Sequence, residues 1–183
     1  MYKRVFVFVG LIWCCFAFFS CRNDDKAMIK NEISFFLGKE IIIPNSLIAF
    51  NTSKSNKDEI FNKEFIIYSY VDSIDCSECK IKQVLPWMDY LQKYTDNMLS
   101  FVLIFNTNDI EELQYNIKLN GFNLPYFVDI DNKFKEKNPS MPTISVLKTF
   151  LTHNNKVVLI GNPNISKRLD GIYQETIHSK IIR

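Results

Sequence analysis

The sequence places two cysteines, Cys76 and Cys79, shortly after a run of apolar residues that is typical of a buried strand. This run, Phe65 to Val71, is rich in β-branched and aromatic side chains. From Ser77 to about Tyr94, apolar residues recur at helical spacing, so the cysteine pair stands at the start of a predicted helix. A strand, a short turn and a helix that opens with C-x-x-C constrain the fold more than any other feature of the chain.

The start of a helix is a position where a cysteine becomes reactive. Unsatisfied backbone N–H groups and the helix dipole favour negative charge there, which stabilises a thiolate that can attack disulfides. A second cysteine one turn along can then close the mixed disulfide. We therefore assign Cys76 as the nucleophile and Cys79 as the resolving cysteine. A purely structural disulfide is the alternative, although so small a loop gives little stabilisation.

The remaining chain alternates predicted strands and helices. Strands are predicted at 101–105 and 126–130, and a hairpin at 143–151 and 156–160 with residues 152–155 as its turn. Helices are predicted at 77–94 with a kink at Pro86, from Asn108 or Asp109 to Asn120, at 166–182, and in shorter form at 29–37 and 132–137, whereas 51–58 is predicted as a loop. Parallel units followed by an antiparallel hairpin predict an α/β fold, with a mixed central sheet flanked by helices on both faces.

The C-x-x-C arrangement and the sequence Met141-Pro142-Thr143, just before the predicted hairpin, together resemble the thioredoxin superfamily over about residues 60–183. In that family a cis-proline precedes the hairpin and faces the dithiol. The resemblance implies a thioredoxin-like fold, a cis peptide bond at Pro142, and a substrate groove formed by Met141, Pro142 and Thr143. The layout is most similar to thioredoxin-like bacterial lipoproteins of the extracytoplasmic thiol–disulfide oxidoreductase type.

Two departures from that family bear on the chemistry. Tyr70 stands six residues before Cys76, where thioredoxin carries a buried aspartate, and Asp72 is the nearest acid that could replace it. Asp72, Asp75 and Glu78 surround the cysteines, and nearby carboxylates disfavour a thiolate. A less stable thiolate makes the disulfide a weaker oxidant, so we expect a reductant or disulfide carrier.

The first twenty residues read as a lipoprotein signal peptide. Lys3 and Arg4 precede an uncharged run of 16 residues, which is shorter than the ~20 that a spanning helix needs. The end of the run, Phe18 to Cys21, resembles the lipobox of bacterial lipoproteins, which implies cleavage before Cys21 and a lipid on its sulfur. Arg22 after the cysteine favours the outer membrane by the same resemblance. A retained N-terminal anchor is the alternative.

These assignments divide the chain into a signal peptide (1–20), a tether (21–27) and a thioredoxin-like domain (28–183). Without Lys3 and Arg4, 20 of the 22 basic residues remain, and they balance the 20 acidic ones. That balance, with no basic stripe, argues against a nucleic-acid partner. His153 and His178 lie far from the cysteine pair in sequence, so we expect neither a zinc site nor another cofactor.

Two functions follow as hypotheses. The first is a lipid-anchored enzyme, on the extracytoplasmic side of a bacterial membrane, that exchanges disulfides with exported proteins through Cys76 and Cys79. The second is a non-catalytic thioredoxin-like lipoprotein, whose groove near Cys76 and Pro142 binds a partner polypeptide.

Overall fold

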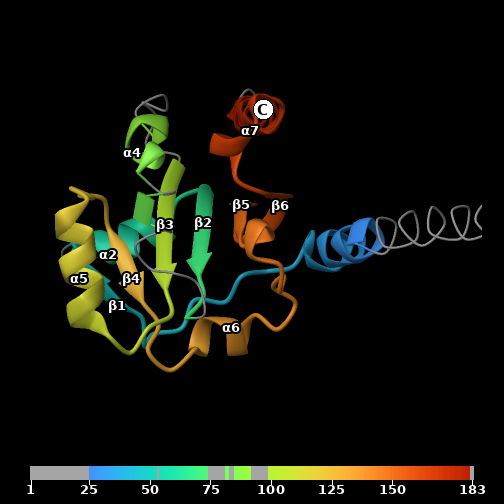
Figure 1. Ribbon diagram of the computed structural model, residues 1–183. Helices are drawn as coiled ribbons and strands as arrows, with labels where there is room; N and C mark the ends of the chain where they lie inside the picture. Colours follow the sequence, from blue (N-terminus) through green and yellow to red (C-terminus); the bar gives the residue numbers. More distant parts are fainter. Residues whose placement is uncertain (1–24, 53, 74–80, 83–84, 92–98, 182–183) are drawn as a thin grey trace, which may run out of the picture. The chain divides into compact units, whose positions relative to one another are not determined.

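The computed structural model describes residues 25–52, 54–73, 81–82, 85–91 and 99–181 (Figure 1). The chain divides into two units, Met1–Phe35 and Phe36–Arg183. Residues 25–36 are helical, which confirms the predicted helix around Ile29 and Ile33, and Gly38 follows its end with a φ of +76°. Within the described ranges, no helix is long and apolar enough to cross a membrane.

The second unit is built on a mixed six-stranded sheet with the strand order β1-β4-β3-β2-β5-β6. Strand β2 pairs in parallel with β3, and β3 pairs in parallel with β4. The β1–β4, β2–β5 and β5–β6 pairs are antiparallel. The strands are β1 (Ile48–Phe50), β2 (Phe65–Val71), β3 (Leu99–Phe105), β4 (Tyr126–Val128), β5 (Thr149–His153) and β6 (Lys156–Ile160). The predicted mixed sheet is therefore confirmed.

The hairpin between β5 and β6 turns at two asparagines. Asn154 and Asn155 have φ angles of +49° and +63°, the left-handed pair that a tight two-residue hairpin needs. On its other side, β6 pairs with residues 38–41, since Gly38 N donates to Val157 O (2.8 Å) and Ile41 N donates to Asn155 O (2.8 Å). This extra segment covers what would otherwise be an exposed sheet edge.

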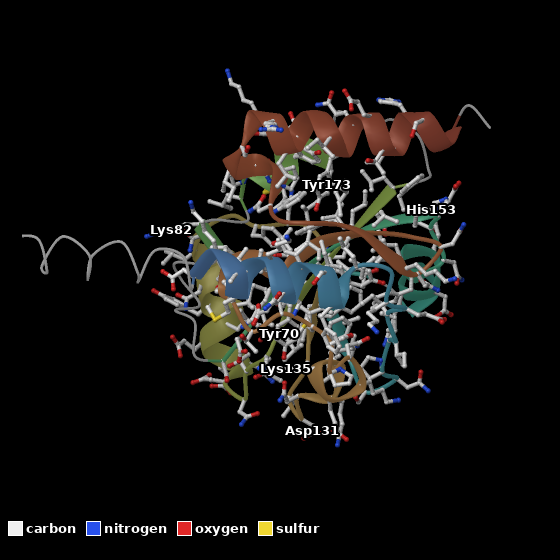
Figure 2. All side chains as sticks on the ribbon, turned by 90° about the vertical axis from the view of Figure 1, so that its right-hand side faces the viewer. Tyr70, Lys82, Asp131, Lys135, His153 and Tyr173 are labelled. Atoms are coloured by element: carbon white, nitrogen blue, oxygen red, sulfur yellow. The ribbon has the colours of Figure 1, made fainter. Side chains whose placement is uncertain are left out.

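Alternate side chains of the central strands enter two separate cores. On β2, Phe65, Ile67 and Val71 join the first core, whereas Tyr68 and Tyr70 join the second. The first core also contains Tyr173 of the C-terminal helix, on the opposite side of the sheet from Tyr70 (Figure 2). Because β2 is buried along its whole length, both of its faces are covered, as a central strand of an α/β sheet requires.

The helices cover these two faces. Besides the helix at residues 25–36, the labelled helices are α2 (Lys54–Phe61), α4 (Pro86–Leu91), α5 (Ile110–Leu119), α6 (Lys133–Lys137) and α7 (Lys167–Ile181), with short 3-10 turns η1 (Ser145–Leu147) and η2 (Pro163–Ile165). Helices α4, α5 and α7 contribute to the first core, and α2 and α6 to the second. Asp109 caps α5 by accepting from Glu112 N at 2.8 Å, which confirms the predicted start of that helix.

Three predicted boundaries are wrong in part. Residues 54–61 form α2 instead of a loop, because Ile60 and Phe61 pack into the second core while the rest of α2 shows no apolar period. Strand β5 begins at Thr149 instead of Thr143. Thr149 pairs with Ser69 of β2, and residues 145–147 turn as η1 before it. Residues 81–82 are helical and Pro86 begins α4, so within the described residues the predicted helix is divided before Pro86, a position that suits a residue without an N–H.

Candidate functional site

Polar side chains follow each of the three parallel strands. Asp72 comes directly after β2, Asn106 directly after β3 and Asp129 directly after β4. The backbone ties these positions together, because Asn106 N donates to Val71 O (2.9 Å) and Asp129 N donates to Phe105 O (2.9 Å). The carboxyl ends of parallel strands are where open α/β sheets commonly bind ligands. This edge of the sheet is therefore the candidate functional site.

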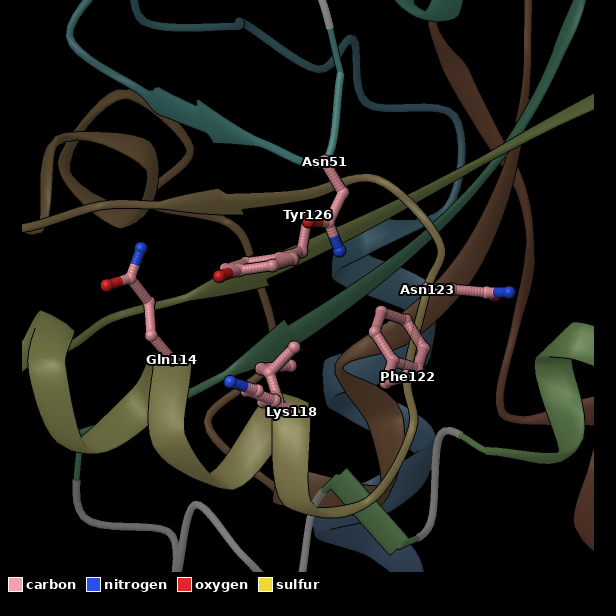
Figure 3. Close-up of a pocket in the computed structure, with 7 residues that line it drawn as sticks. Asn51, Gln114, Lys118, Phe122, Asn123 and Tyr126 are labelled. Atoms are coloured by element: carbon pink, nitrogen blue, oxygen red, sulfur yellow. The ribbon is translucent and has the colours of Figure 1, made fainter.

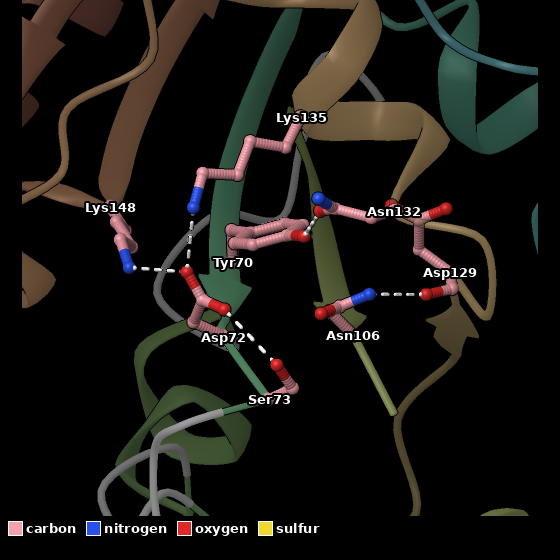
Figure 4. Close-up of polar contacts among 8 residues, drawn as sticks. All are labelled: Tyr70, Asp72, Ser73, Asn106, Asp129, Asn132, Lys135 and Lys148. Atoms are coloured by element: carbon pink, nitrogen blue, oxygen red, sulfur yellow. Dashed lines mark hydrogen bonds and ion pairs between the residues drawn. The ribbon is translucent and has the colours of Figure 1, made fainter. Parts of the chain in front are cut away.

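Asp72 forms the centre of the site with two lysines from distant parts of the chain (Figure 4). Its Oδ2 atom lies 2.9 Å from Lys148 Nζ and 3.0 Å from Lys135 Nζ. Lys148 precedes β5 and its backbone oxygen accepts from Tyr70 N at 2.9 Å, so the hairpin register delivers its side chain. Lys135 comes from α6, which lies beside the ends of β2 and β3 toward which their arrows point (Figure 1).

Asp72 is a stable anion in this arrangement. Burial opposes its ionised form, but the hydrogen bonds and positive charges of Lys148 and Lys135 outweigh burial and lower its pKa from 3.8 to about 2. At neutral pH the carboxyl group is therefore fully ionised and holds no proton to give. The suggestion that Asp72 replaces the buried aspartate of thioredoxin as a proton carrier does not fit this geometry.

Tyr70 also fails to supply a mobile proton. Its ring stacks on Phe134 with a centroid distance of 5.6 Å, and its hydroxyl donates to Asn132 Oδ1 at 2.9 Å. Burial raises the pKa of Tyr70, and the negative charges of Asp129 and Asp72 raise it further. Tyr70 therefore remains a neutral hydrogen-bond donor that joins β2 to the start of α6.

Asp129 fixes the position of α6. Its two carboxylate oxygens accept from Lys133 N (2.8 Å) and Phe134 N (2.9 Å), the free N–H groups at the start of that helix. Asn106 Nδ2 donates to the backbone oxygen of Asp129 at 2.7 Å. The carboxyl ends of β3 and β4 thus hold the helix that carries Lys135, and Asp129 has a structural role.

The predicted cysteine residues lie outside the described residues. This applies to Cys76 and Cys79 and also to Cys21. The chain that leads to Cys76 leaves from Asp72 at the candidate site. In the sequence, Cys76 follows Asp72 by four positions.

The predicted cis-proline is wrong. No peptide bond in the described part of the chain is cis, and this part includes the bond between Met141 and Pro142. Met141 and Pro142 are buried, Thr143 is exposed, and Met141 packs in the second core. Strand β5 starts six residues later than predicted. The residues that directly precede it are therefore η1 and Lys148, and not Pro142.

His153 and a surface hollow lie elsewhere in the described part of the chain. No group of three or more metal-ligating acids, cysteines or histidines occurs among the described residues. His153 Nε2 lies 2.9 Å from Glu64 Oε1, and its ring stacks on Phe65. A hollow of about 530 Å³ lies at the other end of β4, lined by Asn51, Gln114, Ile117, Lys118, Phe122, Asn123 and Tyr126 (Figure 3).

The fold is thioredoxin-like, as comparison with solved structures shows. A thioredoxin-like protein solved in its oxidized form is 15% identical, with a TM-score of 0.53 over 77% of this chain and 97% of that one. The thioredoxin domain of a thiol-disulfide oxidoreductase from Bacteroides vulgatus is 12% identical, with a TM-score of 0.53 over 74% and 96%. A putative protein disulfide isomerase from Bacteroides thetaiotaomicron is 16% identical, with a TM-score of 0.53 over 78% and 94%.

The sequence itself matches no protein-family model and no curated protein. The likeness therefore establishes the architecture, and the chemistry must be argued from this chain's own residues. The residues that sequence reasoning missed are Lys148, Lys135, Asn132, Asn106 and Asp129. One signal was available: Lys148 interrupts an apolar segment next to a strand, where an unpaired lysine is seldom buried.

Proposed function

We propose that this protein is a thiol–disulfide oxidoreductase that acts through Cys76 and Cys79. The observation that carries the proposal is the position of Asp72. It ends the central strand β2 at the carboxyl edge of a thioredoxin-like sheet, and the C-x-x-C sequence begins four residues later.

The chemistry needs only the two cysteines and a substrate disulfide. The Cys76 thiolate attacks one substrate sulfur, the substrate S–S bond breaks, and the released sulfur takes a proton. Cys79, as a thiolate, attacks Cys76 in the mixed disulfide and frees the second substrate thiol. Two electrons have then moved from the protein dithiol to the substrate, and Cys76 and Cys79 end as a disulfide. The reverse sequence oxidises a substrate dithiol.

The substrates that we propose are exported proteins, and the anchor is a lipid on Cys21. Two of the similar structures are of a thiol-disulfide oxidoreductase and a putative protein disulfide isomerase, which supports protein disulfides as the substrate class. The sequence before Cys21 supports placement outside the cytoplasm, where disulfides persist, and Arg22 after it favours the outer membrane. The proposed direction is that of a reductant or disulfide carrier.

Reduction of insulin by dithiothreitol, catalysed by the full-length chain in detergent, tests the proposal. We expect catalysis that is abolished by Cys76→Ser and retained by Cys21→Ala. Cys79→Ser should trap a mixed disulfide with the substrate that dithiothreitol releases. Turnover that is unchanged by Cys76→Ser would contradict the proposal.

A second candidate function is a non-catalytic domain that binds a partner polypeptide. Two observations favour it: Tyr70 replaces the buried acid of thioredoxin, and the bond before Pro142 is trans. The same variants separate the two functions. A binding domain would retain its partner after Cys76→Ser and would form no mixed disulfide in the Cys79→Ser variant.

A further inference from the structure

The hollow at the start of β4 has an apolar floor that belongs to the first core. Its volume is about 530 Å³, within the range of roughly 300–1,000 Å³ that small-molecule sites in proteins occupy. Ile117, Phe122 and Tyr126 line it, and all three are buried members of that core. The floor is therefore held in place by packing, and two of its three residues are aromatic.

Three polar side chains border one end of this hollow (Figure 3). Gln114 and Lys118 are exposed and stand four residues apart on α5, so they lie on the same face of the helix. The hydroxyl of Tyr126, from β4, points toward the side that they border. A carboxamide, an ammonium group and a hydroxyl can each donate a hydrogen bond. Donors from two elements thus meet at one end of an apolar floor.

These three donors are not engaged by the protein. In the described part of the chain, the Gln114 amide, the Lys118 ammonium and the Tyr126 hydroxyl have no hydrogen-bond or ion-pair partner. Burial raises the pKa of Tyr126, so its hydroxyl keeps its proton. The residues that line the hollow include no aspartate or glutamate, and Glu111, one turn before Gln114, lies outside the lining. The lining therefore has a formal charge of +1.

The wall beside β1 is already in place without a ligand. The Tyr126 ring stacks on Phe50, with a centroid distance of 5.1 Å and an angle of 9° between the rings. Asn51 Nδ2 donates to Leu124 O at 3.3 Å, which joins the end of β1 to the segment before β4. A ligand that enters a preformed site loses less affinity to the ordering of protein side chains.

We infer that this hollow binds a small organic carboxylate that carries a flat apolar group. The carboxylate accepts from Lys118, Tyr126 and Gln114, and the apolar group lies against the floor. A hydrogen bond between an ammonium group and a carboxylate is roughly twice as strong as a neutral one, so an acid should bind better than its amide. This site goes beyond the proposed function, since it uses neither Cys76 nor Cys79.

Amide chemical shifts of the full-length, 15N-labelled protein in detergent test the inference. Phenylacetate should cause saturable shifts in α5 and at residues 122–126. Phenylacetamide, which has the same ring without the charge, should bind about tenfold more weakly. N-acetylphenylalanine, which represents a polypeptide that ends in phenylalanine, identifies the source of the carboxylate. Tighter binding than phenylacetate would indicate a chain terminus, and weaker binding a free acid; both outcomes support the site.

Two variants test the assigned donors. Lys118→Gln should weaken phenylacetate about tenfold, and Tyr126→Phe about fivefold. Because the Tyr126 hydroxyl bonds to no described residue, Tyr126→Phe should leave the midpoint of thermal unfolding unchanged, which a structural role would lower. Lys137→Gln, an exposed lysine in the last turn of α6 as Lys118 is in that of α5, is the matched control and should bind as the wild type does.

Three results would each overturn the inference: no saturable shift, equal affinity for phenylacetate and phenylacetamide, or equal affinity in Lys118→Gln and Lys137→Gln. None of them bears on the proposed function. A failure of that function would appear as absent insulin reduction, with the phenylacetate titrations unchanged.

Discussion

The ammonium nitrogen of Lys148 lies 2.9 Å from a carboxylate oxygen of Asp72, and both side chains are almost fully removed from solvent. Asp72 ends the central strand β2, and Lys148 stands just before the antiparallel strand β5. The pair therefore joins the two segments that meet at the carboxyl edge of the sheet. Because one partner cannot be removed without leaving the other charge buried, this pair is the most sensitive point of the site.

Replacing Asp72 by alanine should lower the free energy of unfolding by roughly 3 kcal/mol, since it leaves the buried Lys148 ammonium without its acceptor. Urea denaturation of the wild type and the variant measures the loss. The double variant Asp72→Ala with Lys148→Met should recover a large part of it, because methionine fills similar space without a charge. A double variant as unstable as the sum of the two single variants would show that the pair is not coupled.

The stability of the protein should fall in acid as Asp72 is protonated. Its pKa is about 2 in the folded protein against 3.8 for the ordinary group, so the folded state binds the proton less tightly than the unfolded chain. The resulting stabilisation, roughly 2 kcal/mol, is complete above about pH 5 and is lost as the pH falls from 3.8 through 2. Comparing urea denaturation at pH 5 and pH 2 tests this. The Asp72→Asn variant should lack this part of the pH dependence.

Gly161 should tolerate no side chain. Its φ is +117°, and a Cβ atom there would lie 2.9 Å from Leu169 Cδ2 on α7. Its backbone oxygen also accepts from the buried Tyr173 hydroxyl at 2.7 Å. Gly161→Ala should therefore destabilise the protein by about 2 kcal/mol or more in thermal or urea denaturation. Gly121→Ala is the matched control: it also has a positive φ, but nothing lies within 4 Å of its Cβ position, so its loss should be smaller.

Cys21→Ala should release the protein from membranes if lipid on that sulfur is its anchor. Cell fractionation followed by immunoblotting measures the distribution. Cys15→Ala, a change of the same kind inside the predicted signal peptide, is the control and should leave the protein in the membrane fraction. Persistence of Cys21→Ala protein in membranes would favour a retained N-terminal anchor.

The central strands and the last helix could be predicted because each shows its apolar composition or helical periodicity within its own stretch of sequence. The prediction of Phe65–Val71 as a strand agrees with β2 residue for residue, and the predicted helix at 166–182 agrees with α7 to within a residue at each end. Helix α2 and the late start of β5 could not be predicted. In both cases contacts with residues distant in sequence decide the structure: packing in the second core for α2, and pairing with β2 for β5.

The sequence by itself determined the α/β architecture, the position of C-x-x-C after a central strand, and the alternation that sends β2 side chains into two cores. These features follow from the spacing of apolar residues at intervals of two to four positions, and this spacing can be read directly from the sequence. Only the tertiary structure decided that Asp72 is neutralised by Lys148 and Lys135, and that Met141 and Pro142 are both buried with a trans bond between them. Charge balance at a site depends on which residues fold into contact, and neighbours separated by more than sixty positions leave no periodic pattern in the sequence.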